Sequence, residues 1–163
     1  FTTGYLDKSL LGRMNAKAMF SAASKVDSTI QITINNGGRN YIARGDLTFR
    51  DIYRSFPFDN SIVLMDVSSL DLLSETSGYN CFYNPSHLTK PVASSSLTYR
   101  VAVIDYLALH QNSSHDLNYF PSQNNVRILS SDEYLPRNIM KDEFNGLASF
   151  SSNDYSGTDF QYA

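Results

Sequence analysis

The residues best suited to chemistry lie in two short segments, Asn35-Asn36-Gly37-Gly38-Arg39 and Phe56-Pro57-Phe58-Asp59-Asn60. In the first, a glycine turn is followed by an arginine, whose planar guanidinium can hold the paired oxygens of a phosphate or a sugar. In the second, an aromatic ring beside a proline turn offers a flat surface on which a base can stack. Together the two segments predict a polar pocket with a stacking surface.

Each of these residues also has a simpler explanation. Arg39 could form a surface ion pair with Asp46 or Asp51. Asn36 could point its amide at a phosphate, or it could be a turn asparagine in the left-handed conformation. Phe58 could be a core residue, since large aromatic side chains usually pack inside a protein.

The elements that would position the first segment follow from hydrophobic spacing. Apolar residues recur at helical spacing over residues 10–24, which predicts a helix with Asp7 or Ser9 as its cap. Residues 29–35 alternate, with isoleucines on one face. This alternation predicts a half-buried strand that leads into the glycine turn.

The elements around the second segment are short. Thr48 is placed to cap a helix over residues 49–54. Residues 61–67 form an apolar run rich in β-branched side chains, which is typical of a strand covered on both faces. A further short helix is expected over residues 68–74.

The second half of the chain gives weaker signals. Residues 97–109 are the longest strand candidate, and residues 126–129 indicate one more short strand. Residues 132–144 are expected to be helical in part, with Pro136 interrupting the helix. The sequence predicts a domain over residues 1–144 and a tail over residues 145–163, which is loosely ordered or docks on something outside the chain.

Composition limits the functional classes. The chain has 163 residues, a net charge of −3 and no basic tract, so we expect no nucleic-acid polymer as a partner. No apolar run approaches the ~20 residues of a membrane helix, and no signal peptide is visible. Cys81 is the single cysteine, and the three histidines are too scattered for a dinuclear metal site. Because the chain opens on Phe1, we expect it to be a piece of a longer protein.

Several segments, in order, resemble the C-terminal domain of the 5'-nucleotidase and UDP-sugar hydrolase family. The family wording includes L-G-N-L-x-x-D-A-M, N-G-G-G-I-R, G-D-I-T, P-F-G-N, K-T-Y-R-V-A and N-F-L-A. The segments of this chain that resemble these six motifs are, in the same order, residues 11–19, 35–39, 45–48, 56–60, 97–102 and 105–108, and the strand over residues 62–67 follows the fourth of them. No single motif is decisive, but their shared order over most of the first 120 residues identifies the resemblance.

The resemblance implies roles for five residues. Phe58 and Tyr106 correspond to the two aromatic rings that sandwich the base, although either could instead be a core residue. Asn36, Arg39 and Asp116 would orient the sugar and the phosphate. Asp116 matches the family aspartate only if an insertion is allowed, and it could equally be a solvated loop carboxylate.

The resemblance also implies the rest of the enzyme. The fold would be α+β, with mixed β-sheets and helices packed on their outer faces. A metallophosphoesterase domain N-terminal to this chain would bind two divalent ions, such as Zn, Mn or Mg, and activate a water. This chain would bind a nucleotide or nucleoside but no metal, and alone it would be inactive. Family members usually act in secreted, periplasmic, lumenal or vacuolar settings.

The chain departs from the family at several points, which keeps other functions open. Its glycine turn is shorter than the N-G-G-G-I-R of the family, so either Asn35 or Asn36 could be the family asparagine. The G-G-D-G loop is replaced by residues 111–119, which include a formal glycosylation sequon at Asn112, and no arginine precedes Arg13. A non-catalytic binding or scaffold domain of a pseudoenzyme is one alternative. A hydrolase of UDP-sugars, nucleoside diphosphates or cyclic nucleotides is another.

Overall fold

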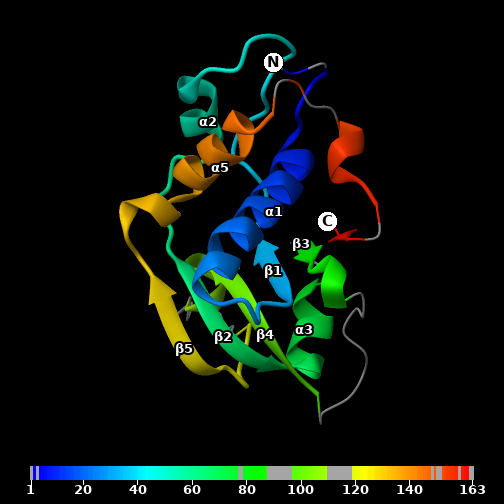
Figure 1. Ribbon diagram of the computed structural model, residues 1–163, viewed down its shortest axis with the longest axis vertical. Coiled ribbons are helices and arrows are strands. Elements are labelled where there is room, and N and C mark those ends of the chain that lie inside the picture. Colours follow the sequence, from blue (N-terminus) through cyan, green and yellow to red (C-terminus); the bar gives the residue numbers. More distant parts are fainter. Residues whose placement is uncertain are drawn as a thin grey trace.

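A mixed β-sheet forms the middle of the domain, with helices on both of its faces (Figure 1). The computed structural model describes residues 2, 4–76, 79–87, 97–109, 119–147, 149, 152–157 and 159–161. Within these residues the sheet has six strands in the order β5-β2-β4-β1-β3-β6. Only the β1–β4 pair is parallel among the strand pairs of the described residues.

The strands are β1 (Ile32–Asn35), β2 (Ile62–Ser68), β3 (Asn80–Tyr83), β4 (Thr98–Ile104), β5 (Asn124–Leu129) and β6 (Phe160–Gln161). The α-helices are α1 (Lys8–Val26), α2 (Phe49–Ser55), α3 (Ser69–Thr76), α4 (Asp105–Ala108) and α5 (Pro136–Asn145). Short 3-10 turns cover Pro85–His87, Asp132–Tyr134 and Ser152–Tyr155. The α+β class and the packing of helices outside a mixed sheet confirm the fold expected from the sequence.

The two faces of the sheet bury separate apolar clusters. Helices α1 and α5 pack together on one face, and α2 lies beside α5 at one end of the molecule, as Figure 1 shows. Helices α3 and α4 cover the other face. Successive residues of β2 alternate between the clusters: Leu64 packs under α1, whereas Val63 and Met65 face α3 and α4. This confirms that β2 is covered on both faces.

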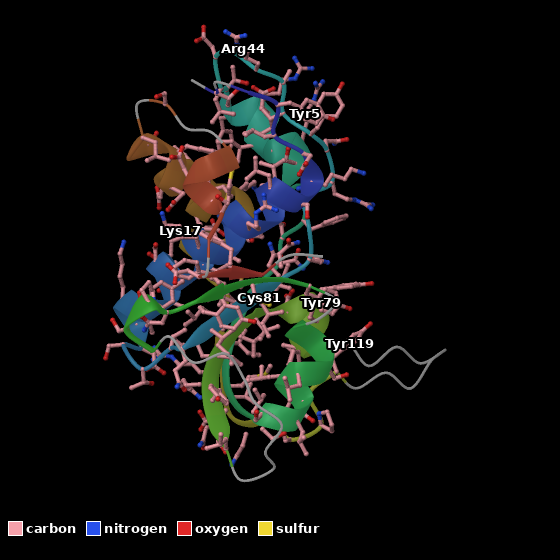
Figure 2. The ribbon with its side chains drawn as sticks, turned by 90° about the vertical axis from the view of Figure 1, so that its right-hand side faces the viewer. Tyr5, Lys17, Arg44, Tyr79, Cys81 and Tyr119 are labelled. Atoms are coloured by element: carbon pink, nitrogen blue, oxygen red, sulfur yellow. The ribbon has the colours of Figure 1, made fainter. Side chains whose placement is uncertain are left out.

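The side of the sheet under α3 also carries aromatic side chains. Tyr79 and Tyr119 meet edge to face, with their ring centroids 6.1 Å apart, and Cys81 lies buried nearby (Figure 2). Arg44 and Tyr5 lie toward one end of the molecule, away from Tyr79 and Tyr119 (Figure 2).

Helix α1 confirms the predicted helix and extends it by two residues at each end. Asp7 is its cap, because its carboxylate accepts the backbone N–H of Leu10 at 2.7 Å. A basic residue, Lys25, occupies the last turn, where its positive charge interacts favourably with the negative end of the helix dipole.

Strand β1 differs from the sequence prediction, because it is buried on both faces rather than half-buried. The polar residue on its second face, Thr33, is fully buried and donates its hydroxyl to the carbonyl of Ala16 at 2.6 Å. A satisfied threonine therefore packs against α1 in a position that the alternating pattern assigned to solvent.

Two further predictions needed correction. The strand expected over residues 97–109 ends at Ile104, and the chain then turns into α4. Pro136 does not interrupt a continuous helix but stands at the first position of α5, where its missing N–H costs nothing.

The segment from residue 145 onward is described over residues 145–147, 149, 152–157 and 159–161. Its described residues pack against the domain: Tyr155 and Phe160 are buried, and β6 pairs with β3. Arg13 of α1 donates its Nε–H to the carbonyl of Tyr155 at 2.9 Å. Among the described residues of this segment, the buried aromatic side chains of Tyr155 and Phe160 supply the packing, which the polar composition of the segment does not indicate.

Candidate functional site

A cavity of about 690 Å³ opens where the start of α1, the end of β1, the end of α2 and the start of α4 meet. Four of the five residues predicted from the sequence line it: Asn36, Arg39, Phe58 and Tyr106. The other lining residues are Lys8, Asn15, Asn35, Gly37, Gly38, Ser55, Phe56, Pro57, Asn60, Ile104 and Pro136. Its volume lies within the range of small-molecule pockets, about 300–1,000 Å³.

The glycine turn is fixed against two helices. The N–H of Gly38 donates to the carbonyl of Lys8 at 3.2 Å, and the N–H of Arg39 donates to the carbonyl of Ser55 at 2.8 Å. A Cβ added at Gly38 would lie 3.2 Å from the Cβ of Leu11, so the chain passes tightly over α1. The turn needs glycine for this close approach and not for a positive φ, which among the described glycines occurs only at Gly45 and Gly157.

Asn36 is not the left-handed turn residue that the sequence allowed. Within the described part of the chain, Asn125 is the only non-glycine residue with a positive φ. Asn36 is half-buried directly after β1 and lines the pocket, whereas its neighbour Asn35 is buried with its amide 3.5 Å from the carbonyl of Gly12. Of the two asparagines, Asn36 is thus the more accessible to a ligand.

Arg39 is placed over an aromatic ring. Its guanidinium carbon lies 5.1 Å from the ring centroid of Phe58, a cation–π distance. No ion pair joins Arg39 to Asp46 or Asp51 in the described structure. Asp51 instead completes the capping box of α2, whose cap is Thr48: its carboxylate accepts the hydroxyl and the backbone N–H of Thr48, and these bonds hold the pKa of the Asp51 carboxyl below its usual value.

The two predicted aromatic rings are half exposed rather than buried in the core. Phe58 is 52% exposed and Tyr106 is 50% exposed, and both line the same cavity. Tyr106 reaches this position because the strand ends at Ile104 and one turn of helix follows. The same turn buries Leu107 and Ala108 on the far face of the sheet.

Asp105 holds the segments that carry the two rings together through hydrogen bonds. Its carboxylate accepts the side-chain amide of Asn60 at 2.7 Å and the backbone N–H of Ser61 at 2.9 Å. Its own N–H donates to the carbonyl of Ser61 at 3.0 Å. Sequence analysis assigned no role to Asp105 or Asn60, because their pairing spans 45 positions of the chain.

The loop that carries Phe58 is also held from α5. Asp59 lies 2.7 Å from the guanidinium of Arg137, and that guanidinium stacks over the ring of Tyr53 with 5.1 Å to the centroid. Phe58 therefore sits between two anchored neighbours, Asp59 toward α5 and Asn60 toward α4.

The charge of the pocket favours an anion. Lys8 and Arg39 line it, and no carboxylate is among its described lining residues. Lys8, Asn15 and Asn60 were missed by the sequence analysis. Asn15 could have been found as a polar residue on the apolar face of α1, but nothing in the sequence marks Lys8, which is one of several surface cations.

Some sequence predictions fall on parts of the chain that the structure leaves out. Asp116, His110, His115 and the sequon at Asn112 lie outside the described residues. Within the part that is described, no group of three or more His, Cys, Asp or Glu side chains could hold a metal ion. None of the described helices is long and apolar enough to cross a membrane.

The comparisons with known proteins agree on one family. The family described as 5'-nucleotidase, C-terminal domain, matches residues 2–72, which include Arg39 and Phe58. A probable 5'-nucleotidase of Treponema pallidum (strain Nichols) is 41% identical over 70 residues, which is 39% of this chain and 11% of that protein.

Solved structures show the same fold. A 5'-nucleotidase precursor from Thermus thermophilus superposes with a TM-score of 0.67 and 16% identity, over 91% of this chain and 36% of that one. The NAD nucleotidase of Haemophilus influenzae gives a TM-score of 0.63 and 16% identity, over 93% and 35% of the two chains. The chain thus spans about a third of the length of these structures.

The fold and the site together define a class of protein. It is an α+β domain with a cationic pocket, lined by aromatic rings, between its helices and its sheet. Residues 2–72 of this chain match the family described as 5'-nucleotidase, C-terminal domain, and the similar proteins named above are nucleotidases.

Proposed function

We propose that this chain is the nucleotide-recognition domain of a metal-dependent 5'-nucleotidase, an enzyme that converts nucleoside 5'-monophosphates to nucleoside and phosphate. The observation that carries the proposal is the convergence of Asn36, Arg39, Phe58 and Tyr106 on one pocket. These residues come from three segments of the chain, and the residue types together with the family resemblance had selected them.

The chemistry of the pocket matches the parts of a nucleotide. Two half-exposed rings, Phe58 and Tyr106, would hold the base, and stacking of this kind contributes about 1–3 kcal/mol per base. Arg39, Lys8 and Asn36 would meet the oxygens of the sugar and phosphate, since guanidinium, ammonium and amide groups all donate hydrogen bonds. Asp116 would accept bonds from the ribose hydroxyls.

Bond cleavage is assigned to a different domain. A metallophosphoesterase domain N-terminal to this one would hold two divalent ions, such as Zn, Mn or Mg, that supply the activated water. Residues 1–144 would present the substrate to it, so this chain alone would bind but not hydrolyse. We also propose that the whole enzyme acts in a secreted, periplasmic or lumenal compartment, as expected for the family.

Phosphate release from AMP by the full-length parent protein, with and without a chelator, tests the proposal. Release that the chelator abolishes and added metal restores is expected. Because residues 111–119 differ in sequence from the loop of the family, two other results would also be informative. Release from UDP-sugars, nucleoside diphosphates or cyclic nucleotides but not from AMP would change the substrate class. Binding without release from any of them would instead make the parent a pseudoenzyme.

A further inference from the structure

A buried amide with no hydrogen-bond partner lies at the inner end of the pocket. Asn15 of α1 is fully buried, and neither its Nδ2 nor its Oδ1 has a partner among the described residues. Leaving a buried donor and acceptor unpaired costs free energy, so such groups in proteins are usually satisfied by something. The amide is therefore a candidate for a partner outside the chain.

The position of Asn15 points to that partner. Asn15 lines the large pocket and also a smaller cavity of about 10 Å³ beneath it. The two cavities share Asn60, Ile104 and Pro136 as well, so the smaller one is a deep extension of the larger. Its volume suits one water or one small polar group of a ligand.

The neighbours of Asn15 lie close to the proposed base site. Asn60 follows the ring of Phe58 by two residues, and Ile104 precedes the ring of Tyr106 by two residues. Both residues line the smaller cavity together with Asn15, so the segments that carry the two rings also border the amide of Asn15. The cations Lys8 and Arg39 come from the start of α1 and the turn, where an anionic group would bind.

We propose that Asn15 is a specificity-determining residue that pairs its side-chain amide with an adjacent hydrogen-bond donor and acceptor on the edge of the nucleobase. This proposal rests on the nucleotide-binding function proposed above. A carboxamide presents one acceptor and one donor side by side, which is the arrangement that pairs in two places with a base edge. A phosphate offers acceptors only, so it would satisfy the nitrogen and leave the oxygen unpaired.

Because the amide of Asn15 is unpaired, its replacement should affect stability and base recognition in opposite directions. Replacing Asn15 by leucine, which has a similar size and shape, removes two unsatisfied polar atoms from the interior. The variant Asn15→Leu should therefore melt at or above the temperature of the wild type while it loses base recognition. A residue that only served the fold would show the reverse, because its replacement would lower the melting temperature and leave ligand choice unchanged.

The test is a binding titration of this chain by calorimetry, with two pairs of nucleotides. AMP is compared with purine riboside 5'-monophosphate, which lacks the exocyclic amine. UMP is compared with 3-methyl-UMP, in which the ring N–H is blocked. For at least one pair the wild type should prefer the natural nucleotide by roughly 5- to 150-fold, and Asn15→Leu should bind both members within about twofold.

A matched control is available on the neighbouring strand. Thr33 is equally buried beside α1, but its hydroxyl is satisfied by the carbonyl of Ala16 and it does not line either cavity. Thr33→Val should lower the melting temperature and keep the nucleotide preference.

The outcomes separate the two proposals. Nucleotide binding in which Asn15→Leu retains the preference of the wild type, or in which the wild type shows none, overturns the role of Asn15 alone. Such a result, with a lowered melting temperature, would assign Asn15 to a buried water. A wild-type chain that binds no nucleotide overturns this inference together with the proposed function.

Discussion

Asp105 and Asn60 join the two ring-bearing segments of the pocket through a hydrogen bond of 2.7 Å. Asn60 follows the Phe58 turn, and Asp105 directly precedes Tyr106. The same carboxylate accepts the N–H of Ser61, the residue that leads into β2. The spacing of the two rings is thus set by a carboxylate that does not itself line the pocket.

Asp105→Ala should therefore weaken nucleotide binding without removing a ligand contact. The expected loss is roughly tenfold, because small displacements of positioning groups can cost up to about 10²-fold in related settings. Titration of the chain with AMP measures it. Asp71→Ala is the control, since Asp71 accepts the N–H of Ser122 at 2.8 Å on the far face of the sheet. If both variants lose stability and neither loses affinity, Asp105 does not position the rings.

Gly12 permits α1 to lie directly against the strand that follows α3. A Cβ at Gly12 would fall 2.3 Å from the Nδ2 of Asn80 and 3.1 Å from the Cα of Gly37. Gly12→Ala should destabilise the domain by about 1–3 kcal/mol through overpacking. Denaturant unfolding measures this loss.

The same contact predicts a rescue. Because Asn80 supplies the two nearest atoms, the double variant Gly12→Ala/Asn80→Ala should lose less stability than the sum of the single variants. Strictly additive losses would show that the clash is relieved elsewhere.

The hydroxyl of Tyr155 should make the stability of the domain depend on pH. Burial, together with the nearby charge of Glu143 and the hydrogen bond to it, raises the pKa of the Tyr155 hydroxyl far above its usual value. The unfolded chain releases this proton near pH ~10, so the stabilisation is complete below that pH and is lost as the pH rises above it.

Melting temperatures measured on both sides of that pH test this point. Tyr155→Phe should flatten the alkaline decline relative to the wild type. Tyr5→Phe removes the same hydroxyl from a ring that is 58% exposed, and it should leave the decline unchanged. Equal slopes for all three proteins would mean that Tyr155 ionises as readily in the fold as outside it.

Much of the arrangement could be predicted from the sequence, because local patterns carried it. Asp7 and Thr48 both cap the helices they were expected to cap, and the apolar run of β2 is buried on both faces as predicted. Asn36, Arg39, Phe58 and Tyr106 line one pocket, and their residue types together with the family resemblance had singled them out.

What the sequence could not predict depends on contacts between distant segments. The docking of Tyr155 rests on Arg13, 142 positions away, and the turn at Asp105 rests on Asn60. The sequence places Asn15 as a polar residue on the apolar face of α1, but the two cavities beside its amide are formed by residues from distant segments. Hydrophobic periodicity is a property of one segment at a time, so it does not indicate which distant residues contact each other.

The measurement that bears most directly on the function of this pocket is the binding of AMP and of ribose 5-phosphate to the wild type and to Phe58→Ala and Tyr106→Ala. Base stacking predicts that each alanine variant loses about 1–3 kcal/mol of affinity for AMP and none for ribose 5-phosphate. Tyr106→Phe, which keeps the ring, should bind AMP nearly as the wild type does. Unchanged AMP affinity in both alanine variants, or an equal loss for ribose 5-phosphate, would contradict base stacking in this pocket.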